Sequence, residues 1–217
     1  MVVEGRVTEK QSLTIRGDVL MKILSVKNPK YTSRIVMDDG TKILIPKPYV
    51  WGAFEKAHGC SLRNGVCIAL QYLKVRQSDG SIWNPKEIYK WAKKNVRGYT
   101  GSKLTIYGTV KVINGISHHP KAKWYPITGK NNAEVIKNIK NALKGNCIVL
   151  FEQRNPVHTV AFVGYDKKGR LMVIDNGKVK KSSVRAQVKN KALHGGNKHT
   201  NWFKSSDTGA GYVIVRR

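Results

Sequence analysis

Cys60 follows Gly59 at the start of a segment with helical apolar periodicity, which predicts a thiol at a helix N-terminus. Unpaired backbone N–H groups and the positive end of the helix dipole favour a thiolate over a thiol at such a position. A cysteine there can be a nucleophile at neutral pH if a base lies near it. For Cys67 and Cys147, the simpler interpretation is a small, buried hydrophobic residue.

A histidine that could be this base lies in the second half of the chain. Residues 146–165 read as an apolar strand, a polar turn with Pro156 and a second apolar strand, which His158 opens. A third strand over residues 170–174 ends at Asp175. If the last two strands pair as a hairpin, His158 lies beside Asp175, because antiparallel neighbours run in opposite directions. The pattern predicts a thiolate that attacks a carbonyl, an imidazole that transfers the proton and a carboxylate that orients the imidazole.

Each of these residues also has an ordinary structural interpretation. A histidine before an apolar strand can cap a turn, and the Asp-Asn-Gly sequence that begins at Asp175 is a common turn. The order cysteine, histidine, aspartate on these three elements favours the catalytic interpretation.

The same segments resemble peptidase C39-like domains of the papain-like cysteine peptidase superfamily. The resemblance rests on Gly59-Cys60, on the strand His158-Thr-Val-Ala-Phe-Val-Gly-Tyr-Asp and on the strand Leu-Met-Val-Ile-Asp175, and it covers roughly residues 45–217. It implies a cysteine hydrolase that cleaves a peptide or amide bond, with Cys60 as nucleophile, His158 as base and Asp175 as the orienting residue. It also implies a papain-like fold and no cofactor.

The second donor to the oxyanion is the open question in this resemblance. Such families usually place a small-residue run after the cysteine and a glutamine donor about six positions before it, where this chain has Phe54. The nearby polar candidates are Glu55 and His58. Because a carboxylate would repel an oxyanion, we expect Glu55 to face away and His58, or a backbone N–H, to supply the contact.

The chain is strongly basic, with 40 Lys and Arg against 13 Asp and Glu and a formal net charge of +27 over 217 residues. The charge is spread along the sequence, and a run from Lys178 to Lys204 contains basic residues and no acidic one. Such a surface attracts polyanions, for example nucleic acid or an anionic wall polymer, although surface charge more often serves only solubility. Because no zinc-finger spacing, RNP-type motif or clear helix-turn-helix pattern is present, polyanion binding would be nonspecific.

These features leave three functional hypotheses. The first is the cysteine hydrolase, acting on a peptide substrate. The second is a catalytically silent C39-like domain that binds an anionic polymer, with Cys60 as a structural residue. The third is acyl transfer from the same thioester to an amine.

Three cysteines give no even-numbered disulfide framework, and Cys60 and Cys67 are separated by about 10 Å if they share one helix, so free thiols are expected. The histidines of His118-His119 and the pair His194 and His199 lack acidic or cysteine neighbours at ligand spacing, so no metal site is expected. No run approaches the ~20 apolar residues of a membrane span, and the first residues lack the apolar core of a signal peptide. We expect a cytoplasmic protein, or a secreted or cell-surface one if a leader has been removed.

Strand-like alternation dominates residues 11–46, and the Asp38-Asp39-Gly40 turn predicts a hairpin there. Pro46 and Pro48 mark the expected boundary between an N-terminal β extension, residues 1–46, and a C39-like domain, residues 47–217. In the second unit, helices are expected over residues 60–75, 84–92 and 132–143, and strands follow. Helices first and mainly sequential strands later indicate an α+β fold, with N-terminal helices packed on an antiparallel sheet.

Overall fold

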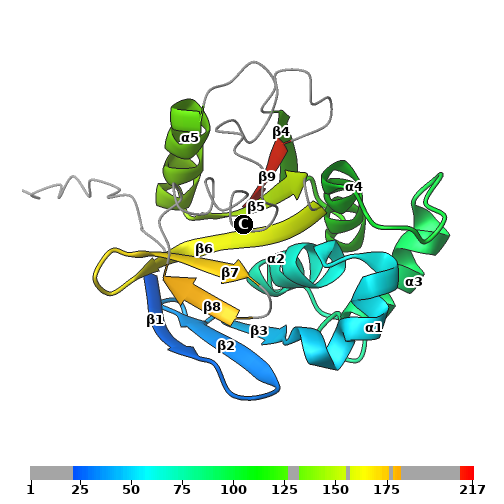
Figure 1. The fold of residues 1–217 in the computed structure, drawn as a ribbon, viewed down its shortest axis with the longest axis horizontal. Helices are drawn as coiled ribbons and strands as arrows, with labels where there is room; N and C mark the ends of the chain where they lie inside the picture. Colours follow the sequence, from blue (N-terminus) through cyan, green and yellow to red (C-terminus); the bar gives the residue numbers. More distant parts are fainter. Residues whose placement is uncertain (1–21, 127–131, 155–156, 176–177, 182–210) are drawn as a thin grey trace, which may run out of the picture.

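The strands and helices assemble around one large sheet that has helices on both faces (Figure 1). The computed structural model describes residues 22–126, 132–154, 157–175, 178–181 and 211–217. The strands are β1 (Lys22–Lys27), β2 (Thr32–Met37), β3 (Lys42–Pro46), β4 (Ala122–Pro126), β5 (Cys147–Arg154), β6 (Val157–Asp166), β7 (Leu171–Asp175), β8 (Lys178–Lys181) and β9 (Gly211–Arg216). The helices are α1 (Pro48–His58), the π-helix η1 (Ser61–Cys67), α2 (Ile68–Tyr72), α3 (Pro85–Asn95), α4 (Ile106–Ser117) and α5 (Asn132–Lys144).

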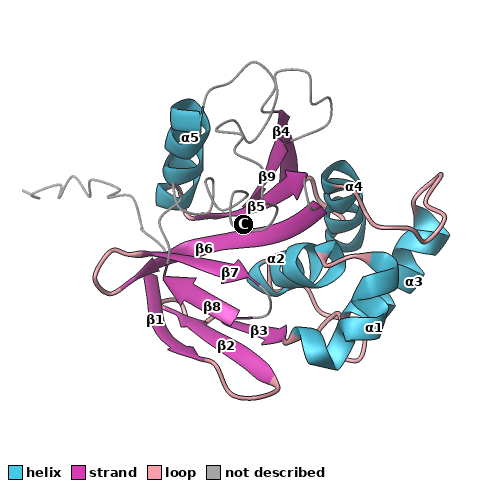
Figure 2. Ribbon diagram, viewed as in Figure 1, coloured by secondary structure: helices cyan, strands magenta, loops and turns pink. Residues whose placement is uncertain are grey.

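The sheet is mixed, which corrects the expectation of a purely antiparallel one. Its strand order is β3-β2-β1-β6-β5-β9-β4, and β7 and β8 continue from β6 (Figure 2). Every pair is antiparallel except β1 and β6, where Lys22 lies opposite Tyr165 and Ile23 opposite Asp166. This parallel pair joins segments far apart in the sequence, so no local turn signal could have revealed it.

The first three strands belong to the same sheet and the same core as the rest of the molecule. The turn that contains Gly40 connects β2 and β3 as the expected antiparallel hairpin. Ile35, Met37, Ile43 and Ile45 are fully buried in the cluster that also contains residues of α2, α3 and α4. Over the residues that the structure describes, the expected N-terminal extension is therefore a continuation of the central sheet.

The central strands are apolar on both faces because both faces are covered. On β5, Ile148 and Leu150 pack in the core shared with α2, α3 and α4, whereas Val149 and Phe151 pack in the core beneath α5. Side chains alternate between the two faces with a period of two, so continuous apolar runs are what such a layer requires. The sheet thus forms the middle layer, and it carries His158 and Asp175 between the two helical layers.

Local signals predicted two of the helices well. Asn84 caps α3, because its side-chain oxygen accepts hydrogen bonds from the N–H groups of Lys86 and Glu87 at 3.0 and 3.1 Å. Helix α5 begins at Asn132, as expected, and extends to Lys144. No helix in the described parts of the chain combines the length and apolarity that crossing a membrane requires.

Candidate active site

Gly59 makes the turn that places Cys60 at the start of a helix. Helix α1 ends at His58, and Gly59 follows it with φ 79° and ψ 162°. This left-handed φ is costly for other residues, and a Cβ at Gly59 would also lie 3.3 Å from Cγ of Lys103. Cys60 is the N-cap of η1, and its carbonyl accepts hydrogen bonds from the N–H groups of Arg63 and Asn64 at 3.1 and 2.7 Å.

The expected α-helix over residues 60–75 begins at Cys60 but has a different winding and an earlier end. Its first part, Ser61–Cys67, is a π-helix, and the α-helical continuation ends at Tyr72. Every residue of η1 is buried. Such π-helical turns are rare and occur frequently at functional sites.

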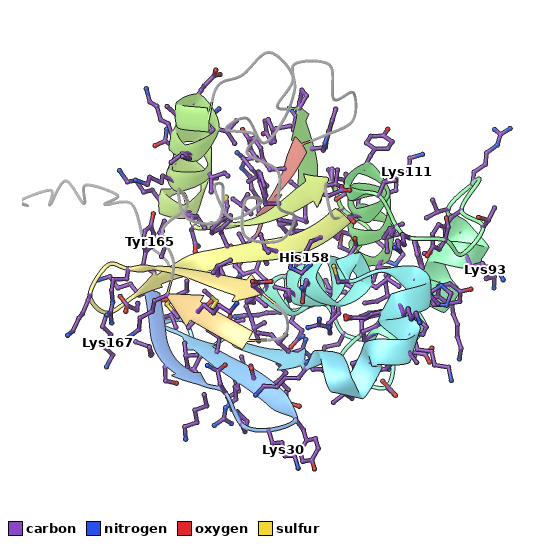
Figure 3. The ribbon with its side chains drawn as sticks, viewed as in Figure 1. Lys30, Lys93, Lys111, His158, Tyr165 and Lys167 are labelled. Atoms are coloured by element: carbon purple, nitrogen blue, oxygen red, sulfur yellow. The ribbon has the colours of Figure 1, made fainter. Side chains whose placement is uncertain are left out.

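Two donors converge on the sulfur of Cys60. The Nδ1 atom of His158 lies 3.6 Å from Sγ, and the backbone N–H of Thr159 donates to Sγ at 3.3 Å. Figure 3 shows His158 where the sheet meets the helices at the start of β6. Both donors are suited to stabilise a thiolate.

The second ring nitrogen of His158 is bound to Asp175. Nε2 lies 2.6 Å from Oδ1 of the carboxylate, which is 2% exposed. The β6–β7 register pairs Ala161 with Ile174, so Asp175 falls opposite Val160 and shares a face with His158. The structure thus brings together Cys60, His158 and Asp175, which come from three separate segments.

Asp175 has a second cationic partner that the sequence interpretation missed. Nζ of Lys180 lies 3.1 Å from Oδ2 of Asp175, the oxygen that His158 does not use. Lys180 was recognised only as a member of a basic run. In the β7–β8 pairing, Asp175 lies opposite Lys178 and Val173 lies opposite Lys180. Lys180 is therefore a diagonal neighbour of Asp175, within reach of its carboxylate.

The ionisation of Cys60 and His158 follows from this geometry. Burial opposes the charge on Cys60, but the hydrogen bond and the positive charge of His158, with the N–H of Thr159, outweigh burial and lower the pKa of the thiol. Burial likewise opposes the charge on His158, yet its bonds to Asp175 and Cys60 raise its pKa to about 9. Both shifts favour a thiolate–imidazolium pair over a neutral thiol and a neutral imidazole.

The carboxylate is held in its charged form by the same network. Burial alone would raise the pKa of Asp175, but hydrogen bonds from His158 and Lys180 lower it to about 2. Asp175 thus stays ionised throughout the pH range in which the thiolate–imidazolium pair exists.

The other two cysteines lie in a different environment. Burial raises the pKa of Cys67 to about 11, and its thiol donates to the carbonyl of Trp83 at 3.2 Å. Burial also raises the pKa of Cys147. All three cysteines are free thiols, so Cys60 alone combines partial exposure with a lowered pKa.

Polar side chains inside η1 fix the helix against β6. The hydroxyls of Ser61 and Thr159 are 2.9 Å apart, and the side-chain N–H of Asn64 donates to the carbonyl of Thr159 at 2.9 Å. Sequence reasoning overlooked both residues, although two polar side chains in a buried helix are themselves a signal. Their contacts hold the residue next to His158 against the helix that carries Cys60.

A buried ion pair joins η1 to α1. The guanidinium of Arg63, 1% exposed, binds both carboxylate oxygens of Glu55, one of them at 3.1 Å, and also donates to the carbonyl of Pro46 at 3.0 Å. The charge of Glu55 raises the pKa of Cys60, so Glu55 lies near enough to affect the thiol. The positive charge of Arg63 offsets the charge of Glu55, and its hydrogen bonds hold both carboxylate oxygens in the ion pair.

His58 lies in an aromatic cluster between α1 and α3. Its ring centroid is 4.6 Å from that of Phe54 and 4.2 Å from that of Tyr89. Its Nδ1 lies 2.6 Å from the carbonyl oxygen of Gly101, which can only accept, so Nδ1 carries a hydrogen. His58 can therefore donate to an oxyanion from Nε2 only as the imidazolium.

These contacts define a cysteine–histidine–aspartate site on a mixed α/β fold. No protein-family model matches the chain, and no curated protein matches its sequence. Within the described ranges, no group of three or more His, Cys, Asp or Glu side chains is arranged to hold a metal ion. His194, His199 and the basic run beyond Lys181 lie outside the described residues.

For any reaction in which His158 donates a proton, replacing Lys180 with methionine should move the alkaline limb of the pH–rate profile to higher pH. Without the ammonium group, His158 is the remaining partner of Asp175 among the described residues, so the already raised pKa of His158 should rise further. The profile of kcat/KM against pH measures this shift. Lys181→Met is the control, because Lys181 lies on the same strand and is exposed. A limb that moves to lower pH, or the same shift in the control, would contradict the role of Lys180.

Proposed function

We propose that this protein is a cysteine hydrolase that cleaves a peptide or amide bond through a thioester on Cys60. The observation that carries the proposal is the contact chain from Sγ of Cys60 to Nδ1 of His158 and from Nε2 to Asp175, at 3.6 and 2.6 Å. The lowered pKa of Cys60 and the raised pKa of His158 supply a nucleophile and an acid at the same pH.

The proposed reaction has two halves. The thiolate of Cys60 attacks the carbonyl carbon, and the carbonyl electrons move to oxygen. As the tetrahedral intermediate collapses, the C–N bond breaks and His158 gives its Nδ1 proton to the leaving nitrogen. A water molecule then attacks the thioester, His158 takes its proton, and the C–S bond breaks to release the acid and restore the thiolate. An amine in place of water would give acyl transfer by the same route.

Stabilisation of the oxyanion is assigned to backbone and side-chain donors near Cys60. The N–H of Cys60 at the helix start is the first proposed donor, and the ring of His58 is the proposed second one. One donor of this kind typically contributes about 10²–10³ in rate. Nδ1 of His58 is occupied by the carbonyl of Gly101, so Nε2 is the ring nitrogen that would contact the oxyanion.

The arrangement of the layers supports a papain-like fold. The cysteine begins a buried helix, and the histidine and aspartate lie on adjacent antiparallel strands of the sheet against which this helix packs. We assign residues 47–217 to the C39-like domain on this basis, with β1–β3 as strands added to its sheet.

Hydrolysis of a broad peptide library tests the proposal. The parent protein should release cleaved products, and Cys60→Ala should release none. Cys67→Ala is the matched control, because its thiol is buried and has a raised pKa, and it should retain cleavage. Cleavage that survives in Cys60→Ala would overturn the proposal. The absence of cleavage by the folded parent would favour the silent polymer-binding domain.

A further inference from the structure

A basic hollow lies where the C-terminal end of α5 meets the turn between β6 and β7. It has a volume of about 580 Å³. Four cationic side chains line it, and all four are exposed: Lys140, Lys144, Arg170 and Lys181. Between them lie the ring of Tyr165 and the side chain of Leu171.

A second hollow adjoins the first along β1. It has a volume of about 410 Å³, shares Arg170 and Lys181 with the basic hollow, and adds Lys167 and Lys168. Asp166 is the acidic residue that lines it, and its carboxylate is bound by Arg170 at 2.6 Å. The two hollows form one positively charged track, which suits a chain of anionic groups.

The aromatic ring in the basic hollow narrows the class of ligand. Tyr165 is partly exposed, and its hydroxyl donates to the carbonyl of Lys140 at 3.5 Å, which helps to hold the ring in place. Sites for single-stranded nucleic acid combine a cationic groove for the phosphates with aromatic rings on which bases stack. A polyanion without aromatic rings would not bury the apolar surface between the cations. A duplex would not bury it either, because its bases are already stacked on one another.

We propose that the basic hollow binds single-stranded nucleic acid, with lysines and Arg170 at the phosphates and a base stacked on Tyr165. Contacts of this kind do not read sequence, because every base has a face that can stack. The proposal does not depend on the hydrolase activity, and either can fail while the other holds.

The basic hollow and the candidate active site lie toward opposite ends of β6 and β7. His158 and Tyr165 are seven positions apart on β6, about 23 Å at ~3.3 Å per residue, and Leu171 and Asp175 are four positions apart on β7, about 13 Å. Figure 3 shows Tyr165 and Lys167 at the left of the molecule and His158 near its centre. A base stacked on Tyr165 would therefore not contact the thiol of Cys60.

Fluorescence anisotropy with the whole protein tests the proposal. The probes are a labelled single strand of about 12 nucleotides and an abasic strand with the same number of phosphates, compared between about 50 and 200 mM salt. The parent should bind the strand with bases more tightly than the abasic strand. Tyr165→Leu, which keeps an apolar side chain, should weaken binding of the strand with bases by about tenfold and leave the abasic strand unaffected.

Charge variants then locate the phosphate contacts. Replacing Lys140, Lys144 and Lys181 together by glutamine should reduce the slope of log K against log salt by about 2, since each phosphate contact on a single strand contributes about 0.7. The matched control replaces three exposed lysines of α3, Lys86, Lys93 and Lys94, by glutamine and should keep the slope of the parent.

Two results would overturn the proposal. Equal affinity of the parent for the strand with bases and the abasic strand would mean that the hollow attracts any polyanion. An equal fall of slope in the α3 control would mean that charge over the whole surface, and not this hollow, attracts the nucleic acid.

Discussion

His158→Ala should lower turnover by roughly 10⁴-fold or more, because removal of one member of a nucleophile–base unit disables the unit. In the proposed mechanism, the imidazole both stabilises the thiolate of Cys60 and supplies the proton for the leaving nitrogen. Truncation of His158 leaves the carboxylate of Asp175 buried, but Lys180 still pairs with it at 3.1 Å. Circular dichroism should therefore show an intact fold in the inactive variant.

Asp175→Asn should be milder than His158→Ala when both are measured on the same substrate. The amide oxygen can still accept the hydrogen bond from Nε2 of His158 and orient the ring, as asparagine does in papain-like sites. Asp175→Ala, which lacks any acceptor, should be worse than Asp175→Asn. If Asp175→Asn lowered kcat/KM more than His158→Ala did, the assigned roles would be wrong.

Arg63→Met should lower the free energy of unfolding by about 3–5 kcal/mol, the usual cost when one partner of a buried ion pair is removed. The guanidinium is 1% exposed and Glu55 is 13% exposed, so the carboxylate left behind would have little access to water. Arg63 also holds the end of β3 through the carbonyl of Pro46. Urea denaturation followed by tryptophan fluorescence measures the change.

A double variant separates the charge effect from simple loss of packing. Arg63→Met combined with Glu55→Gln removes both charges and should regain part of the stability lost in Arg63→Met alone. Two results would contradict this account of the ion pair. One is a double variant that loses more unfolding free energy than the two single variants lose in sum. The other is an Arg63→Met protein as stable as the parent.

The parts of the fold that could be predicted are those with local signals. The hairpin around Gly40 and the strands β5 to β7 have turn residues between apolar runs. Asn84 followed by Pro85 indicates the start of α3. Helices α1 and α4 were missed, although Thr105 before α4 accepts a hydrogen bond from the N–H of Gly108 as a normal N-cap. The parallel contact of β1 with β6 depends on tertiary packing and leaves no local trace.

In the candidate site, too, only the residues with local sequence signals could be predicted. The positions of Cys60, His158 and Asp175 could be inferred, because each ends or begins an element with a clear apolar pattern. Lys180 could not, because β8 reads as part of a charged segment until its pairing with β7 is known. The surroundings of His58 were also out of reach, since Gly101 approaches it from 43 positions further along the chain.

Labelling by a substoichiometric thiol electrophile, followed by mass spectrometry, tests the central claim most directly. The lowered pKa of Cys60 predicts rapid modification of this residue alone, whereas Cys67 and Cys147, buried and with raised pKa values, should react slowly. The rate at Cys60 should fall as the pH drops below the pKa of the thiolate, and His158→Ala should slow it at neutral pH. Equal labelling of all three cysteines in the native protein would contradict the thiolate–imidazolium pair on which the proposed hydrolase rests.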